Sequence, residues 1–229
     1  MSKPVCAIIG IGPGNGASFA RKFDAEGFAV ALLSRSTDLS NKLASDLHEA
    51  KAYACDASDP AAVAAAFDLL QRDLGPVNTL IYNAGSGIWK NIEEITAEEF
   101  ELSWRINTLG ALVSSQQVIP GMKEAGAGNI IFVGATASLR GVPFTTGFAP
   151  AKAAQRILAQ SMAKHLWPQG IHVSIMIIDG GIRPPDSPKS DSSEYLEPDD
   201  IASLAHYLTT QPSSAWSFEV DARPMLEKW

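Results

Sequence analysis

The chain has 229 residues, of which 46% are hydrophobic and 19% charged, with a formal net charge of −7 and a pI near 5.1. This size and composition suit one globular domain, expected over residues 1–229, and exclude a largely disordered chain. The acidic balance leaves no broad basic face for nucleic acid or an anionic membrane, while a compact phosphate ligand stays compatible with it.

Short apolar runs alternate with longer helical patterns along the chain. Each parallel strand needs a crossover to reach its neighbour, so this alternation predicts an α/β fold of Rossmann type: a doubly wound parallel sheet with helices on both faces. Helix starts are marked by Thr96 with two following glutamates and by Pro198 with two aspartates. The expected strands are 5–10, 28–33, 52–55, 77–82, 129–134, 171–178 and 216–221, and the expected helices are 17–26, 38–50, 60–73, 96–125, 146–167 and 198–210.

The chain carries no sign of export, membrane insertion or a metal site. Its N-terminus lacks a basic region followed by a long apolar run, and no stretch approaches the ~20 apolar residues of a membrane span. Cys6 and Cys55 stand in apolar runs without a Cys-x-x-Cys spacing, which favours buried thiols over a disulfide or zinc. The four histidines are scattered without ligand spacing. We therefore expect a cytoplasmic protein without a metal.

One segment, 183–198, is rich in Pro, Ser and Asp and breaks the rhythm of strands and helices. It follows the carboxyl end of an expected strand, where open α/β sheets bind ligands. Two interpretations stay open for it: a short lid over the substrate, and a solvated connection.

A glycine-rich loop, "IIGIGPGNGAS", follows the first expected strand and opens the first expected helix. Gly10, Gly12, Gly14 and Gly16 let the backbone turn tightly and approach a pyrophosphate, which the N–H groups at the start of the helix can bind. In this context the loop favours a dinucleotide site over a purely structural turn.

The spacing of Gly10, Gly14 and Gly16 resembles the Gly-x-x-x-Gly-x-Gly loop of the short-chain dehydrogenase/reductase family. Further segments match this family in order: "CDASD" around Asp56, "YNAG", "RINTLGAL" and "FAPAK". The resemblance covers residues 5 to about 180 and implies a Rossmann-type NAD(P) domain. The residues that it implies for the cofactor are Gly10, Gly14, Asn15, Gly16, Ser34, Arg35, Asp56, Ala57, Asn83, Ala84, Gly85, Lys152 and Gly180.

The end of the second expected strand favours NADP(H) over NAD(H). An NAD enzyme usually has a carboxylate there, whereas this chain has Ser34 followed by Arg35, a cation for a 2′-phosphate. The other interpretation is that Arg35 only decorates an exposed loop. Asp38 stays within reach of a ribose.

The catalytic positions implied by the resemblance are only half kept. Asn107 and Lys152 match the family's asparagine, which supports a relay water, and its lysine, which holds the nicotinamide ribose. The family's tyrosine and serine, which face the reacting oxygen, fall on Phe148 and Ala135. The usual proton donor is therefore absent. Five hydroxyl-bearing residues are candidates to replace this donor: Thr136, Ser138, Thr145, Thr146 and Tyr195. Tyr195 is the first of them, because only a phenol replaces a phenol chemically.

Two functions follow from this pattern. The first is an NADP(H)-binding oxidoreductase that acts on a small carbonyl, alcohol or activated alkene with an altered proton donor. The second is a catalytically silent NADP(H)-binding sensor or structural protein. An α/β domain that binds no nucleotide is weakened by the intact glycine loop. The resemblance also implies a homodimer or homotetramer, paired through the last strand and through the helix that carries Lys152, and the substrate is not identified.

Overall fold

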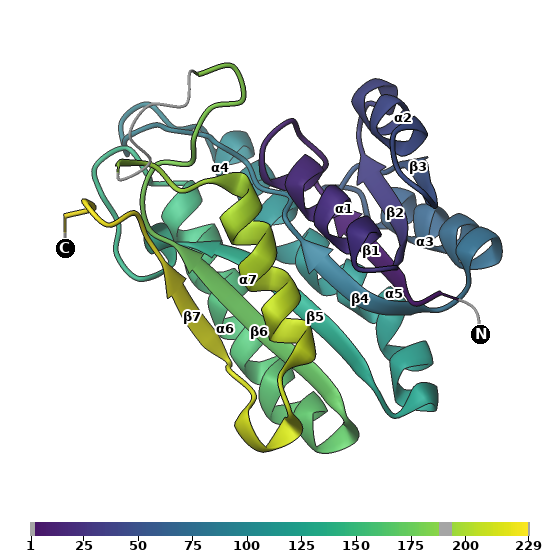
Figure 1. Ribbon diagram of the computed structural model, residues 1–229. Coiled ribbons are helices and arrows are strands. Elements are labelled where there is room, and N and C mark those ends of the chain that lie inside the picture. The colour runs from purple at the N-terminus through teal and green to yellow at the C-terminus, as the bar shows by residue number, and fades with distance from the viewer. Residues whose placement is uncertain (1–2, 188–193, 229) are drawn as a thin grey trace.

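The computed structural model describes residues 3–187 and 194–228, and a seven-stranded sheet runs through it (Figure 1). The strand order is β3-β2-β1-β4-β5-β6-β7, and every neighbouring pair is parallel. This confirms the predicted fold class. The strands are β1 (Val5–Ile9), β2 (Ala29–Ser34), β3 (Ala50–Ala54), β4 (Val77–Tyr82), β5 (Gly128–Ala135), β6 (Ile171–Ile178) and β7 (Glu219–Ala222).

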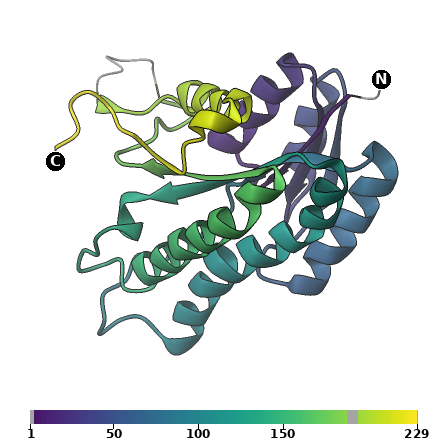
Figure 2. The same ribbon diagram turned by 90° about the horizontal axis from the view of Figure 1, so that it is seen from below.

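Helices cover both faces of the sheet, as Figure 2 shows in a view along the layers. One face carries α1, α2 and α7, and the opposite face carries α3, α5 and α6, with α4 packed against α6. The helices are α1 (Asn15–Ala25), α2 (Asp38–Ser45), α3 (Pro60–Leu74), α4 (Ala97–Trp104), α5 (Gly110–Ala125), α6 (Phe148–Leu166) and α7 (Pro198–Thr210).

The core has two halves, divided by the sheet. Strand β1 is buried on both faces, and its side chains alternate between the halves: Cys6 and Ile8 pack on the α1 and α7 side, Ala7 and Ile9 on the α3 and α5 side. This alternation follows from the two-residue repeat of a strand. Cys6 and Cys55 are free and buried, as predicted. Within the described ranges, no helix is both long and apolar enough to cross a membrane.

The predicted helix starts are confirmed where capping residues mark them. Thr96 precedes α4 and accepts a hydrogen bond from the backbone N–H of Glu99 at 3.2 Å, while the Glu99 carboxylate accepts from the N–H of Thr96 at 3.0 Å. This reciprocal pair satisfies N–H groups that a helix start otherwise leaves unpaired. Pro198 opens α7, followed by Asp199 and Asp200 in its first turn.

Three predicted elements differ from the structure by more than two residues. The helix predicted over 38–50 ends at Ser45, because the side chain of Asp24 accepts the backbone N–H groups of His48 and Glu49 at 2.9 and 3.3 Å and turns this segment toward β3. The strand predicted from 216 begins at Glu219, because residue 217 donates its N–H to the Gln211 side chain instead.

The third difference lies inside the helix predicted over 96–125. Between α4 and α5 the backbone forms a π-helical turn at Arg105–Leu109, in which each hydrogen bond spans one residue more than in an α-helix. Asn107 lies in this turn and is fully buried. A π-helical turn redirects the side chains that it carries, which gives Asn107 an orientation that regular helix geometry would not.

Candidate active site

A trough runs along the carboxyl ends of the strands at the point where the strand order reverses between β1 and β4. It consists of two adjoining pockets that share Asn83 and Gly85. The Arg35 pocket has a volume of about 230 Å³ and the Phe148 pocket about 470 Å³. Predicted site residues lining the Arg35 pocket are Gly10, Ser34, Arg35, Asp56, Ala57, Asn83, Ala84 and Gly85, and those lining the Phe148 pocket are Asn15, Asn83, Gly85, Ala135, Thr136, Phe148, Lys152 and Gly180.

The glycine loop between β1 and α1 has two kinds of glycine. Gly10 has a φ of +96°, and a Cβ there would lie 2.5 Å from the backbone N of Ala84, while a Cβ on Gly16 would lie 2.6 Å from the Gly10 carbonyl oxygen. These two glycines allow close packing within the protein. A Cβ on Gly12 or Gly14 would meet no atom within 4 Å, so the backbone is open above them. Such open backbone is what a pyrophosphate requires for close approach.

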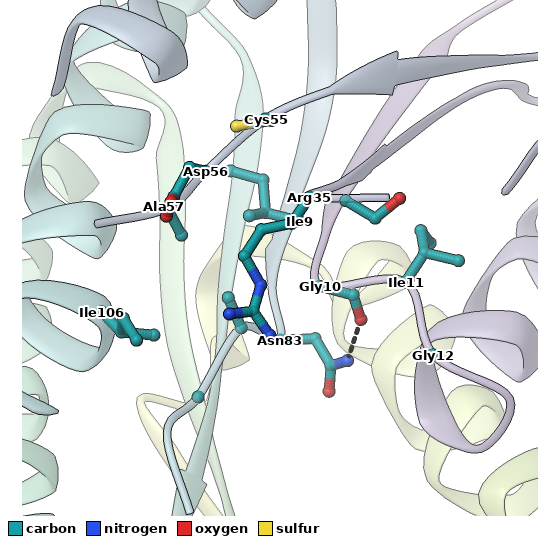
Figure 3. Close-up of a pocket in the computed structure, with 13 residues that line it drawn as sticks. Ile9, Gly10, Ile11, Gly12, Arg35, Cys55, Asp56, Ala57, Asn83 and Ile106 are labelled. Atoms are coloured by element: carbon teal, nitrogen blue, oxygen red, sulfur yellow. Dashed lines mark hydrogen bonds between the residues drawn. The ribbon is translucent and has the colours of Figure 1, made fainter. Parts of the chain in front are cut away.

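The Arg35 pocket is lined by side chains at the carboxyl ends of β2, β3 and β4 and just beyond them. Figure 3 shows the Arg35 side chain extending across it, and the Asn83 amide, whose Nδ2 donates to the Gly10 carbonyl oxygen at 2.7 Å. The Asp56 carboxylate accepts from the backbone N–H and hydroxyl of Ser58 at 2.9 and 2.7 Å. These bonds, and to a smaller degree the charge of Arg35, lower the pKa of Asp56. The Ser34 hydroxyl donates to the Ser36 carbonyl at 2.7 Å.

Lys152 projects from α6 and is almost completely buried. Its Nζ donates to the Val133 carbonyl oxygen at 2.8 Å and to Oε1 of Gln155 at 3.1 Å, and it lies 5.8 Å from the centroid of the Phe148 ring. Burial lowers the pKa of Lys152 to about 7. Both protonation states are therefore populated near neutral pH.

Asn107 is linked to Lys152 through Gln155, a residue outside the predicted site. The Gln155 side chain is fully buried and donates from Nε2 to the Asn107 carbonyl oxygen at 2.9 Å. The Asn107 amide donates to the Ser103 carbonyl at 2.8 Å and to the Ser86 hydroxyl at 3.0 Å, while its Oδ1 is buried without a hydrogen-bond partner. A glutamine three residues after Lys152, on a helix face that otherwise buries mostly alanine, was the available signal.

Phe148 and Ala135 lie together in the lining of the Phe148 pocket. The Phe148 ring contacts Trp89, with centroids 5.2 Å apart and planes tilted by 44°. Trp89 comes from the loop after β4, where no periodic pattern in the sequence indicates it. Aromatic rings and small side chains make this end of the trough mainly apolar.

The predicted substitute hydroxyls are dispersed. Thr136 lines the Phe148 pocket and donates to the Asp179 carboxylate in a short hydrogen bond. Ser138 is buried with an unpartnered hydroxyl but lies outside the described lining of that pocket, and Thr145 donates to the Val142 carbonyl at 2.9 Å. Thr146 donates to the Pro143 carbonyl at 3.5 Å.

Tyr195 lies outside the described lining of the Phe148 pocket. Its ring carbons lie 3.3 Å from a Cβ position on Gly181, and the Arg183 guanidinium lies 5.3 Å from its ring centroid. Of the segment expected to form a lid, residues 188–193 lie outside the described residues. Its two ends are joined by a backbone hydrogen bond from Arg183 to Leu196 at 2.9 Å.

The loop after β6 is held by the C-terminal tail. Gly180 has a φ of +137°, and a Cβ there would lie 2.6 Å from Cδ of Pro224. Asp179, immediately before it, is buried and forms ion pairs with Arg223 at 3.1 Å and Arg140 at 3.9 Å. The tail therefore fixes the backbone of the Phe148 pocket at this point.

The residues of the trough fit a dinucleotide. The backbone above Gly12 and Gly14 is open, and Oδ1 of Asn15, at the start of α1, is buried without a hydrogen-bond partner. An open cradle at a helix start and an unsatisfied polar atom are both expected of a site that completes its hydrogen bonds with a ligand. Across the described ranges, no three His, Cys, Asp or Glu side chains gather as metal ligands would.

The low pKa of Lys152 predicts a pH-dependent stability. Because the native pKa is about 7 and the unfolded value is about 10.4, the unfolded chain binds more protons throughout this interval. The free energy of unfolding of the wild type should therefore rise with pH relative to Lys152→Met, by up to about 1.4 kcal/mol per pH unit. Urea unfolding at pH 7, 8 and 9 measures it. Lys42→Met, at an exposed lysine, is the matched control and should show no such divergence.

Comparisons with known proteins agree with this geometry. A family model described as short chain dehydrogenase matches residues 4–191. A 3-alpha-(or 20-beta)-hydroxysteroid dehydrogenase of Mycobacterium bovis is 30% identical over 92% of this chain and 84% of its own length. An uncharacterised oxidoreductase of Staphylococcus aureus is 26% identical over 98% of this chain and 99% of its own.

Solved structures extend the likeness to the whole fold. A short-chain dehydrogenase from Rhodopseudomonas palustris is 33% identical with a TM-score of 0.83, covering 96% of this chain and 98% of that one. An alcohol dehydrogenase from Thermococcus sibiricus, complexed with 5-hydroxy-NADP, is 25% identical with a TM-score of 0.89, covering 99% of both chains. With the glycine loop, the parallel sheet and a family model that matches most of its length, the chain belongs to the short-chain dehydrogenase family of oxidoreductases.

Proposed function

We propose that the protein is an NADP(H)-dependent oxidoreductase that acts on a small carbonyl, alcohol or activated alkene, with a proton donor other than the family's tyrosine. The observation that carries this proposal is the continuity of the trough: one pocket has Arg35 at the end of β2, and the adjoining pocket has Lys152 and Phe148. A dinucleotide bound across the switch point of such a sheet has its phosphate-bearing and reactive ends in one continuous groove.

Different residues of the trough suit different parts of the cofactor. The open backbone at Gly12 and Gly14 and the start of α1 suit the pyrophosphate, Asp56 suits the adenine, and Lys152 suits the nicotinamide ribose. When bound, the nicotinamide supplies or accepts a hydride. The protein's contribution is to orient the substrate against it in the apolar Phe148 pocket and to exclude water there.

The preference for NADP(H) rests on Arg35. The guanidinium is the cation available where β2 ends, and the acidic residue nearest in sequence, Asp38, begins α2 outside the described lining of both pockets. A planar guanidinium suits a 2′-phosphate, whose charge a carboxylate would repel. Two similar solved structures contain NADP or a derivative of it, which supports the same preference.

Arg35→Ala tests the cofactor site. Loss of a charged hydrogen bond to a phosphate costs about 1.5–3 kcal/mol, so NADPH should bind the variant about 10- to 100-fold more weakly. NADH, which lacks this phosphate, should bind both proteins similarly. Calorimetric titration with both nucleotides measures the difference, and Arg72→Ala, at an exposed arginine on α3, is the control. Absence of binding by either nucleotide to the wild type would refute the proposed function.

A silent NADP(H)-binding protein is the second candidate, favoured by the apolar side chains at Ala135 and Phe148. Turnover separates the two functions. Consumption of NADPH with any ketone, diketone or enone of a panel, or formation of NADPH from NADP+ with any alcohol, establishes an enzyme, whereas tight nucleotide binding with no turnover across the panel favours the sensor.

Assembly into a homodimer or homotetramer is part of the proposal. Large apolar side chains are exposed on α4 and α6, including Phe100, Leu102 and Trp104, each about 40% exposed, and Ile157 at 54%. Exposed apolar patches of this kind often mark subunit contacts.

The cytoplasm is the proposed location, in keeping with two free, buried cysteines.

A further inference from the structure

The Phe148 pocket has one side chain that can exchange a proton near neutral pH. Its described lining includes two hydroxyls, and both are already donating: Ser86 to the Ser103 hydroxyl at 2.8 Å, and Thr136 to the Asp179 carboxylate. Asp179 in turn is ion-paired with two arginines. Of the described lining residues, Lys152 alone is ionisable in this range.

The surroundings of Lys152 leave one of its N–H groups for the pocket. An ammonium group has three donors, and two are accepted by the Val133 carbonyl and the Gln155 side chain. Nζ also lies 3.9 Å from a Cβ position on Gly85 and 5.8 Å from the centroid of the Phe148 ring, and both residues line the pocket. The third N–H group of Lys152 therefore faces the Phe148 pocket.

Gln155 holds Lys152 in this position without adding charge. Its amide spans the gap between Nζ of Lys152 and the Asn107 carbonyl, with bonds of 3.1 and 2.9 Å, and it is fully buried. A carboxylate here would favour the ammonium form and raise the lysine pKa, whereas an amide does not.

We propose that Lys152 is the catalytic residue that exchanges a proton with the substrate heteroatom, and that Gln155 is the positioning residue that aims it. The inference rests on the proposed function and names the proton donor that it leaves open. Val133, Gln155, Phe148 and Gly85, the neighbours of Nζ on β5, α6 and the loop after β4, carry no titratable group. Burial alone accounts for a lysine that is half protonated near pH 7, the range in which an acid–base catalyst works best.

Reduction of a carbonyl group requires a hydride at its carbon and a proton at its oxygen. A reduced nicotinamide bound in the trough would supply the hydride: its C–H bond would break as it is oxidised, a C–H bond would form at the carbonyl carbon, and the electron pair of the C=O π bond would move to oxygen. An N–H bond of the Lys152 ammonium then breaks, its electron pair stays on nitrogen, and the proton forms the new O–H bond. The neutral amine regains a proton from solvent through the pocket, and alcohol oxidation follows the same steps in reverse.

Reductive alkylation tests the placement of the amine without any cofactor. Benzaldehyde with cyanoborohydride modifies neutral amines, so at pH 7 Lys152, whose pKa burial lowers to about 7, should react at least about 10-fold faster than the exposed Lys42. Peptide mass spectrometry locates the label. Modification confined to exposed lysines would show that the Lys152 amine does not face the pocket and would overturn the proposal.

Two variants test Gln155. In Gln155→Glu the midpoint of the labelling pH profile at Lys152 should move up by about one pH unit or more, because a carboxylate stabilises the ammonium form. In Gln155→Met, which keeps the size and removes the acceptor, the midpoint should not rise and labelling should slow as the amine loses its orientation. Circular dichroism checks folding. Folded variants that both keep the wild-type profile would refute the positioning role.

Lys152→Arg separates this inference from the proposed function. Arginine keeps the charge and the donors but does not release a proton near neutral pH. We expect this variant to bind NADPH and to lose at least about 100-fold in carbonyl reduction. Wild-type turnover by Lys152→Arg would overturn the assignment of Lys152, whereas failure of the wild type to bind nucleotide would refute the proposed function and leave the labelling result unaffected.

Discussion

Phe148→Tyr combined with Ala135→Ser is expected to accelerate the reduction of simple ketones and diketones by about 100-fold or more. A positioned acid contributes ~10²–10⁴-fold to such reactions, and both side chains lie in the lining of the same pocket. Lys152 lies 5.8 Å from the Phe148 ring centroid, where its positive charge would favour the ionised form of a phenol and so make it a stronger acid. Initial rates of NADPH oxidation measure the gain.

The controls for this experiment are the two single variants and a phenol placed outside the pocket. Each single variant should gain less than the pair, because the serine and the phenol would bond the same substrate oxygen. Phe144→Tyr adds a phenol to an exposed ring outside the described lining of the pocket and should change nothing. A folded double variant with no gain on any ketone would show that Phe148 and Ala135 do not stand where the reacting oxygen binds.

Gly16→Ala is expected to destabilise the protein by roughly 1–3 kcal/mol, the usual cost of overpacking a rigid site. The added Cβ would lie 2.6 Å from the Gly10 carbonyl oxygen and 2.8 Å from Cα of Ile11, and neither backbone atom moves without disturbing the glycine loop. Urea unfolding measures the loss of stability. NADPH affinity should fall as well, because the same loop forms the cradle for the phosphates.

Gly12→Ala is the matched variant for this comparison. Its Cβ meets no protein atom within 4 Å, so the stability should stay within about 0.5 kcal/mol of the wild type. Its NADPH affinity should nevertheless fall by at least about 10-fold if a pyrophosphate lies against that backbone. Wild-type affinity in Gly12→Ala would contradict the placement of the phosphates and leave the structural role of Gly16 standing.

The fold could be predicted because its determinants are local and repeated. Five-residue apolar runs such as Val5–Ile9 are typical of strands buried on both faces, and residues such as Thr96 and Pro198 mark helix starts. The wrong boundaries have tertiary causes. The side chain of Asp24 ends α2 from another helix, and no local pattern contains that interaction.

The site could be predicted where it depends on backbone geometry, and not where it depends on contacts distant in the sequence. The glycine loop, Arg35 and the pairing of Phe148 with Lys152 at helical spacing are visible in short segments. The hydrogen bonds of Gln155 join α6 to a π-helical turn 48 positions away, and the Thr136 to Asp179 bond spans 43 positions. Whether a buried amide is satisfied depends on such partners, which only the folded chain identifies.

The place of β1 in the sheet determines the order in which this protein can fold as it is synthesised. β1 is the first strand to be made, yet it lies in the interior of the sheet, and its second neighbour, β4, begins only at Val77. At synthesis rates of about 5–20 residues per second, one edge of this wholly apolar strand waits several seconds for its partner. The half that carries the glycine loop and Arg35 is thus synthesised before α6, the helix that carries Lys152.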